Sequence, residues 1–294
     1  MTPVTTSYSF DALLPPAMAE KAEDVGVGKA NLDFYPMFFL AILAGAFIAL
    51  GAVFATSATT GGAELPYGVS KLLAGLTFCL GLILVVVAGA ELFTGNNLKV
   101  MAWASGKLST GTLLRSWAIV YLGNFVGSVL TAWMMFLSGQ YAFGGGEVGL
   151  NALAIADAKT GLTFLPAFML GIFCNALVCL AVWLCMSARS VTDKILAILF
   201  PITAFVAAGF EHCVANMYFI PVGLFIKEGA GTGFWETTGR SAAEYADLTW
   251  GNFLAGNLIP VTLGNIIGGS VMVGLVYWFI YRRMGAGKAA RKSA

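Results

Sequence analysis

Long apolar stretches separated by short polar segments account for most of the chain. Several of these stretches reach the roughly 20 residues that an α-helix needs to cross a bilayer. We therefore expect an all-α membrane protein with six transmembrane helices. The apolar regions lie at about 34–58, 68–100, 112–138, 162–188, 192–226 and 250–281.

The transmembrane domain is predicted to occupy residues 34–283, between an N-terminal segment at 1–33 and a tail at 284–294. The N-terminal segment contains apolar residues at near-helical spacing with charged residues between them. This pattern favours an amphipathic helix at the membrane surface. A poorly ordered tail is the alternative. The apolar residues are Phe10, Leu13, Leu14, Met18 and Val25.

The second and fifth apolar regions are longer than one helix, and each contains a polar interruption with glycine, at 89–96 and at 209–216. A break in a helix frees backbone N–H and C=O groups that lipid cannot satisfy, so it must be buried or line a wet cavity. We expect helices 2 and 5 to be broken there and the breaks to border a substrate path. Free N–H groups at the start of each half-helix would attract anions.

Short motifs repeat in the two halves of the chain. Glu-x-x-x-x-Asn occurs at 91–96 and at 211–216, and Gly-Asn-x-x-Gly occurs at 123–127 and at 264–268. The first pair is 120 residues apart and the second pair 141, a difference that an outer loop at 228–248 can absorb. Because each half holds three spans, an odd number, the second half enters the membrane inverted. The sequence thus predicts two inverted three-helix repeats, at 34–138 and 162–283.

The Gly-x-x-x-Gly spacing by itself favours close helix packing.

Composition and charge support a membrane protein. Hydrophobic residues make up 59% of the chain and charged residues only 11%, whereas soluble domains carry about 25%. The net charge of +1 gives no basis for binding nucleic acid. With six spans, 12 of the 16 Lys and Arg residues fall on one side, which places both termini in the cytoplasm.

His212 is the only histidine, and it lies beside Glu211 in an apolar span. An ionisable residue at membrane depth is a functional candidate, and imidazole exchanges protons near neutral pH. A buried histidine satisfied by the backbone is the alternative. Thr94, in the first break, could donate to an anion or to His212, or could cap the half-helix that follows. One histidine and five scattered cysteines do not form a metal ligand set, so no metal or cofactor is expected.

Longer motifs resemble the formate/nitrite transporter family, and within it the formate channel branch. They include Ala90-Glu91-Leu92-Phe93-Thr94-Gly95, Gly209-Phe210-Glu211-His212 and the run at 257–269 in the last span. The resemblance extends over essentially the whole chain. One departure is Gly95-Asn96, where the formate branch usually has serine after the threonine; the pair is closer to nitrite and hydrosulfide relatives.

The resemblance implies an aquaporin-like protomer in a homopentamer, with one pore per subunit, in a bacterial cytoplasmic (inner) membrane. It implies transport of formate or similarly small monovalent anions, with nitrite, hydrosulfide, acetate and lactate as further candidates, and proton coupling through the pore histidine. No enzymatic activity is expected. The alternatives are a nitrite or hydrosulfide channel of the same family and an aquaporin-type channel for neutral solutes, although the Asn-Pro-Ala triplets of aquaporins are absent.

Roles for individual residues follow from the same resemblance. His212 is placed at mid-pore with Thr94 as its partner, and Lys159 helps to draw anions into the outer vestibule. Taken alone, such a lysine would be a solvated surface charge. We expect Glu91 and Glu211 to accept backbone N–H bonds in their own loops and to point away from the pore, because an exposed carboxylate repels anions.

Two further sets of residues complete the predicted site. Asn175, Asn216 and Asn265 are amides in apolar spans that either line the pore or join helices, and joining is favoured for Asn265. The resemblance selects apolar constrictions, with Phe78, Leu82 and Phe205 narrowing one side and Leu92, Phe93 and Val178 narrowing the other.

Overall fold

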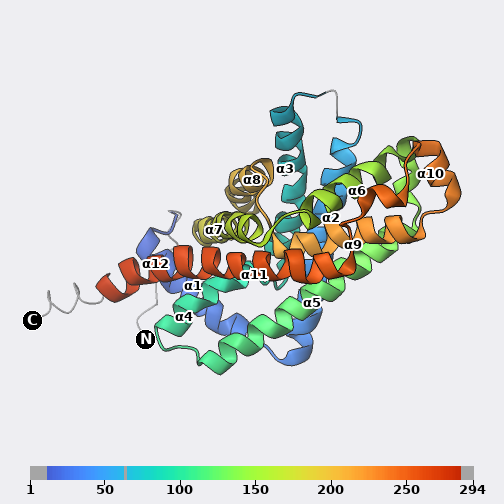
Figure 1. Ribbon diagram of the computed structural model, residues 1–294. Helices are drawn as coiled ribbons and strands as arrows, with labels where there is room; N and C mark the ends of the chain where they lie inside the picture. The colour runs from blue at the N-terminus through green and yellow to red at the C-terminus, as the bar shows by residue number, and fades with distance from the viewer. Residues whose placement is uncertain (1–11, 63–64, 286–294) are drawn as a thin grey trace, which may run out of the picture.

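The computed structural model describes residues 12–62 and 65–285, and these fold into helices packed side by side (Figure 1). Residues 1–11 of the predicted N-terminal segment, including Phe10, and residues 286–294 of the predicted tail lie outside the described residues. The helices of the first half are α1 (Pro15–Ala30), α2 (Phe34–Thr59), α3 (Tyr67–Ile83), η2 (Leu84–Gly89), η3 (Gly95–Lys99), α4 (Val100–Ala104) and α5 (Thr110–Leu137).

The second half begins after a short helical connection and ends in one long helix built from several labelled segments. Its elements are η4 (Gln140–Gly146), α6 (Glu147–Thr160), α7 (Phe164–Ser187), α8 (Val191–Ala207), α9 (Cys213–Gly229), α10 (Thr232–Thr238), η5 (Ala242–Tyr245), η6 (Asn252–Leu258), α11 (Ile259–Ile266), η7 (Ile267–Leu275), α12 (Val276–Trp278) and η8 (Phe279–Arg283).

Five helices in the described part of the chain are long and apolar enough to cross a membrane. The fifth expected region, 192–226, is divided into α8 and α9, each 17 residues long. The chain leaves helical geometry at 90–94 and again at 208–212. Gly89, just before the first segment, and Gly209, within the second, have φ of +84° and +72°, a backbone conformation that other residues rarely adopt. The five helices are Phe34–Thr59, Tyr67–Gly89, Thr110–Leu137, Phe164–Ser187 and Asn252–Arg283.

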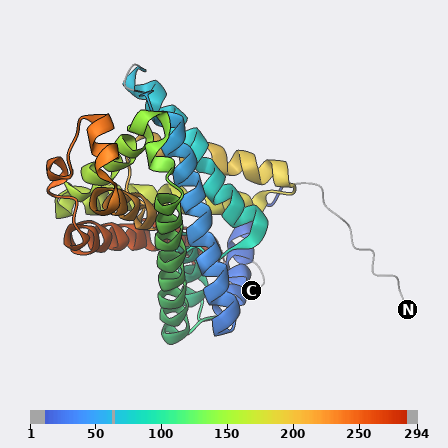
Figure 2. The same cartoon turned by 90° about the vertical axis from the view of Figure 1, so that its right-hand side faces the viewer.

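Corresponding helices of the two halves pack in the same way. α2 lies against α5, as Figure 2 shows, and α7 lies against α11. A Cβ added at Gly127 would overlap the Ile42 carbonyl oxygen of α2, and one added at Gly268 would overlap the Ile172 carbonyl oxygen of α7. These glycines therefore allow close helix packing, as the Gly-x-x-x-Gly spacing suggests.

A helix precedes the first long helix of each half: α1 precedes α2, and α6 precedes α7. Lys29 near the end of α1 lies seven residues before Pro36, and Lys159 near the end of α6 lies seven residues before Pro166. The sequence pattern predicted no helix at α6 and treated residues 1–33 as a separate segment. The structure places both helices in equivalent positions at opposite ends of the molecule (Figure 1).

Buried charge attaches α1 to the rest of the molecule. Glu23 is fully buried, and its carboxylate pairs with Lys107 Nζ at 2.9 Å and with Arg282 Nε at 3.0 Å. Hydrogen bonds to Glu23 and Asp24 raise the pKa of Lys107 above its ordinary value, so this ammonium stays charged well beyond neutral pH. α1 is thus bound to the loop before α5 and to the end of the last helix.

Candidate functional site

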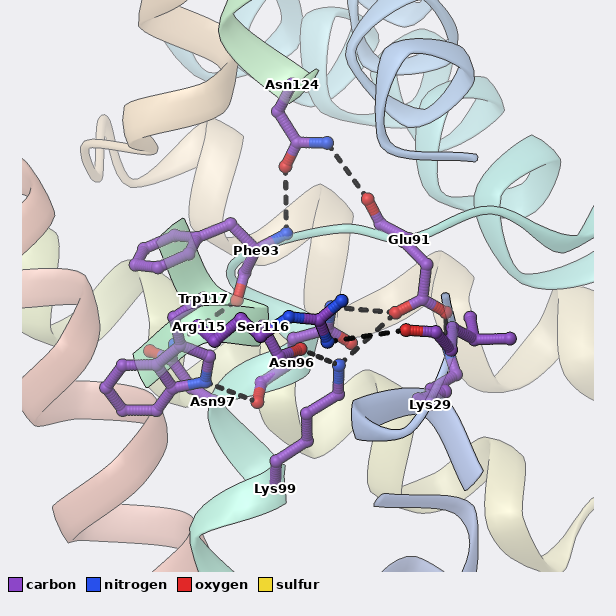
Figure 3. Close-up of polar contacts among 11 residues, drawn as sticks. Lys29, Glu91, Phe93, Asn96, Asn97, Lys99, Arg115, Ser116, Trp117 and Asn124 are labelled. Atoms are coloured by element: carbon purple, nitrogen blue, oxygen red, sulfur yellow. Dashed lines mark hydrogen bonds and ion pairs between the residues drawn. The ribbon is translucent and has the colours of Figure 1, made fainter. Parts of the chain in front are cut away.

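The first break is held in shape by one asparagine of α5 (Figure 3). Asn124 Nδ2 donates to the carbonyl oxygens of Ala41 and Glu91, at 2.8 Å and 2.9 Å, and Asn124 Oδ1 accepts the N–H of Phe93 at 2.8 Å. An amide can satisfy donors and acceptors at once, which suits a segment whose backbone has lost its helical partners.

The second break is held by an asparagine of α11 in the same manner. Asn265 Nδ2 donates to the carbonyl oxygens of Gly171 and Glu211, at 2.8 Å and 2.9 Å, and Asn265 Oδ1 accepts the N–H of Cys213 at 2.9 Å. The amide therefore joins the break to α7 and α11.

The carboxylate of the first break forms a buried ion cluster. Glu91 is only 3% exposed, and its oxygens lie 2.7 Å from Lys29 Nζ and 3.4 Å from Lys99 Nζ. Asn96 Nδ2 donates to the same carboxylate at 2.9 Å. The expected backbone donors are replaced by side-chain donors, because two ammonium groups and an amide occupy both oxygens.

The carboxylate of the second break has a matching cluster with one ammonium fewer. Glu211 lies 2.7 Å from Lys159 Nζ and accepts hydrogen bonds from Asn216 Nδ2 at 2.7 Å and Asn257 Nδ2 at 3.3 Å. Here, too, the donors are side chains rather than the expected backbone groups. Both carboxylates are neutralised by lysine, so neither presents an uncompensated negative charge.

His212 and Thr94 meet between the two breaks. The Thr94 hydroxyl lies 2.9 Å from His212 Nε2, and His212 Nδ1 accepts the N–H of Ala215 at 3.0 Å. Because Nδ1 acts as an acceptor, the proton of the neutral imidazole sits on Nε2 and is donated to Thr94. His212 therefore also caps the N-terminus of α9.

The start of α9 offers fewer free donors than the sequence suggested. The N–H of Cys213 is bonded to Asn265, and the N–H of Ala215 is bonded to His212. These donors are already used inside the protein and are not free for an anion. Positive charge near this break comes chiefly from Lys159.

Asn175 and Asn216 lie in polar contacts between elements. Asn175 is fully buried and donates to the Thr94 carbonyl oxygen, to Asn97 Oδ1 and to the Asn265 carbonyl oxygen. Asn216 donates to Glu211 and to Asn257. Asn175 therefore joins the two halves, whereas Asn216 joins the second break to the last long helix.

Two cavities open at the breaks. A cavity of about 290 Å³ is lined by Lys71, Lys159, Glu211 and His212, among others. A second cavity, of about 420 Å³, is lined by lysines and by Glu91; the lysines are Lys21, Lys29 and Lys194. We call the cavity at Glu91 the first mouth and the cavity at Glu211 the second mouth.

A void of only about 10 Å³ lies between the two mouths, and His212 is part of its lining. It shares Phe78, Phe205 and His212 with the second mouth and Leu82 and Leu92 with the first mouth. The three spaces therefore follow one another in a row. The middle void is about the smallest that can hold one water molecule. Its remaining lining residues are Ile48, Val178 and Ile202.

Five of the six expected constriction residues thus surround one narrow void, and Phe93 does not. The Phe93 ring packs against Tyr121, with ring centroids 4.9 Å apart, and against Trp117 at 6.1 Å. Its backbone is fixed by Asn124, which turns the side chain toward α5.

The sequence reasoning did not select several residues of the two clusters, namely Lys29, Lys99, Ser116 and Asn257. Lys29 could have been found, because the seven-residue spacing from Lys29 to Pro36 repeats from Lys159 to Pro166. Lys99 has no such signal, since the corresponding position in the second half is not a lysine. Within 12–62 and 65–285, no three His, Cys, Asp or Glu side chains are grouped to hold a metal ion.

Comparison with known proteins places this arrangement in a family. A family model described as formate/nitrite transporter matches residues 16–279. The chain is 50% identical over 274 residues to formate channel FocA of Escherichia coli (strain K12), covering 93% of this chain and 96% of that protein. It is 45% identical over 264 residues to formate channel FocA of Haemophilus influenzae, covering 90% and 93%.

A solved structure described as a pentameric formate channel with formate bound is also similar. It superposes with a TM-score of 0.81 at 53% sequence identity, over 84% of this chain and 97% of that chain. An FNT family ion channel superposes with a TM-score of 0.73 at 31% identity, over 90% and 98%.

Proposed function

The chain belongs to the formate/nitrite transporter family, and from this premise we propose that it carries formate and similarly small monovalent anions across a membrane. The observation that carries the proposal is the row of two mouths and a narrow void that passes His212. Formate channels with 45% and 50% identity over most of the chain support formate as the substrate. The pentameric formate channel structure supports a homopentamer, and the row of cavities within a single chain supports one pathway per subunit.

The membrane arrangement is part of the proposal. The five long helices cross the membrane, and α8 and α9 together make the sixth crossing around the second break. Residues 34–138 and 162–283 form the two inverted repeats of the channel domain, with breaks in helices 2 and 5. Segment 1–33 and tail 284–294 lie in the cytoplasm, on the inner face of a bacterial cytoplasmic membrane. Matching contacts of Asn124 and Asn265 support the repeat.

Entry of the anion is favoured by lysine at both mouths. Lys159 and Lys29 are 16% and 38% exposed at their side chains, so each can reach an ion while its other side faces a glutamate. The glutamates fix the two ammonium groups in place. The mouths thereby concentrate anions before the narrow part of the path.

The narrow void then selects for small particles that can lose their water. Its apolar lining makes a bare charge costly, and its volume of about 10 Å³ is too small for formate without movement of side chains. Phe205 of α8, on the side of the second mouth, and Leu92 of the first break, on the side of the first mouth, are the side chains whose displacement opens the path.

His212 offsets the cost of passage by protonation. When a proton is added at Nδ1, the imidazole releases the Ala215 N–H and gives up the cap of α9, a loss of about 0.5–2 kcal/mol. The imidazolium then lends the added proton to formate: the Nδ1–H bond breaks, a formate O–H bond forms, and neutral formic acid crosses the apolar void. Beyond the void the O–H bond breaks and the proton returns to His212, so the net movement is one formate anion and carries current. Thr94 orients the ring through Nε2 and keeps it in this position.

Recordings from purified protein in planar bilayers test the proposal. Anion-selective current with formate is expected, and currents with nitrite, hydrosulfide, acetate and lactate rank the substrates. A larger permeability to nitrite or hydrosulfide would favour the related channel types to which Gly95-Asn96 points. Glycerol permeability in a liposome swelling assay, without anion current, would instead favour an aquaporin-type channel and overturn the proposal.

A further inference from the structure

The two glutamates at the breaks have different counter-ions, although their surroundings otherwise match. Glu91 is paired with two ammonium groups, those of Lys29 and Lys99. Within the part of the chain that the structure describes, Glu211 is paired with one ammonium group, that of Lys159, and receives amide donors instead. Each cluster is almost closed to solvent at its carboxylate, so the difference in charge is weakly screened.

The difference arises at two positions that the repeat relates. The offset of 120 residues that relates Glu91 to Glu211 also relates Lys99 to Phe219. The offset of 141 that relates Asn124 to Asn265 relates Ser116 to Asn257. In the second half the Asn257 amide donates to the carboxylate. In the first half the Lys99 ammonium takes that place.

The Lys99 ammonium is buried next to the first break and is held there by hydrogen bonds. It is 2% exposed, and its Nζ donates to Ser116 Oγ at 2.7 Å and to Glu91 at 3.4 Å (Figure 3). Lys99, at the end of η3, does not line the first mouth, whereas Lys29 reaches the same carboxylate from α1 and does line it. One glutamate and two lysines leave a charge of +1 on this cluster, whereas Glu211 and Lys159 cancel.

We propose that Lys99 is a positioning residue. It neutralises Glu91 from the side away from the first mouth, so that the Lys29 ammonium is left to bind anions at that mouth. The inference rests on the proposed anion transport and deepens it, because it makes the first mouth the stronger anion site. Lys21 and Lys194, which also line this mouth, add to its positive charge. The second mouth has Lys159 and Lys71, but among the described residues Glu211 has no second lysine as a counter-ion.

Single-channel recordings measure the effect, with the formate concentration varied on one side at a time. In Lys99→Met the remaining ammonium, Lys29, must neutralise Glu91 alone. The half-saturating formate concentration at the first mouth is expected to rise roughly threefold to tenfold, while the value at the second mouth stays the same. Lys159→Met marks the second mouth by changing the opposite value.

Two further variants separate charge from structure. Glu91→Gln leaves both ammonium groups and is expected to lower the half-saturating concentration at the first mouth. The double variant Glu91→Gln with Lys99→Met restores a charge of +1 and is expected to return that value close to that of the unmodified protein. A purely structural role would instead make Glu91→Gln and Lys99→Met change the value in the same direction.

The results distinguish the two levels of the argument. If the unmodified protein passes no anion current, the proposed function fails. If it passes formate but Lys99→Met and Glu91→Gln shift both mouths equally or in the same direction, the role of Lys99 is overturned and the proposed function stands. If Lys99→Met does not assemble, Lys99→Gln, which removes the charge but keeps a side-chain donor for Ser116, takes its place. The same rise at the first mouth is expected, and an unchanged value overturns the role of Lys99.

Discussion

Thr94 and His212 are 118 positions apart in the chain, and their side chains meet at 2.9 Å. Thr94 comes from the first break and His212 from the second. The contact therefore joins the two halves beside the narrow void, which His212 lines. Since His212 Nδ1 is occupied by the Ala215 N–H, this bond also fixes which ring nitrogen carries the proton.

Replacing His212 by phenylalanine should remove the group that lends a proton. His212→Phe keeps a flat ring in the void but has no nitrogen, so formate uptake into liposomes at about pH 5 outside is expected to fall roughly tenfold or more. Uptake near pH 8, where proton transfer contributes less, should fall less. The measurement is the initial rate with labelled formate. Unchanged pH-dependent uptake would reject the role of His212.

Removing the hydroxyl of Thr94 should lower formate uptake because His212 loses its hydrogen-bond partner, and not because the width of the pore changes. Thr94→Val has nearly the same shape but no hydroxyl, which leaves His212 Nε2 without its partner at a site that is fully buried. We expect a severalfold lower uptake and a shifted pH profile, because an unpaired buried donor costs about 1–3 kcal/mol. Thr94→Ser, which keeps the hydroxyl, is the matched control and should retain most of the activity.

The parts of this structure that follow from periodicity and spacing were predictable from the sequence. Apolar regions located the long helices, and the repeated Glu-x-x-x-x-Asn motif falls where the chain leaves helical geometry. The Gly-Asn motif marked Asn124 and Asn265 as a repeated pair without predicting that their amides bond to the breaks. These features depend on residue type at fixed separation. The pairing of Thr94 with His212 rested on the family resemblance, since it crosses between the halves.

Features that depend on which way a side chain points were not predictable. Phe93 lies beside residues of the void in sequence, but the hydrogen bond from its N–H to Asn124 turns its ring toward Tyr121. Lys99 sits among apolar residues and gave no pattern, because its partner Ser116 is supplied by α5. α6 was missed because its short run of residues lacks the length of a spanning helix.

The asparagine of the second break is expected to control stability. Asn265→Leu leaves the Cys213 N–H and two carbonyl oxygens without partners in a buried segment, at a cost of roughly 3 kcal/mol or more. The melting temperature of the detergent-solubilised protein should fall well below that of the unmodified protein. Asn252→Ala removes an amide that bonds an exposed loop carbonyl, and it serves as a control with little expected change. Equal melting temperatures for both variants would contradict a structural role for Asn265.

The width of the narrow void should set which anions pass. Phe205 contributes to both the void and the second mouth, and its ring contacts Phe78 and His212, with ring centroids 5.7 Å and 5.9 Å apart. Phe205→Ala removes an aromatic side chain from a space of about 10 Å³, so acetate and lactate should gain permeability relative to formate. The same change lowers the free energy of unfolding by about 3–5 kcal/mol, so assembly must be checked first by size-exclusion chromatography.

Phe200→Ala, a change at an exposed ring on the same helix, provides the control. Reversal potentials in mixed formate and acetate solutions measure the selectivity. An assembled Phe205→Ala channel that still excludes acetate would place the selective step elsewhere along the path.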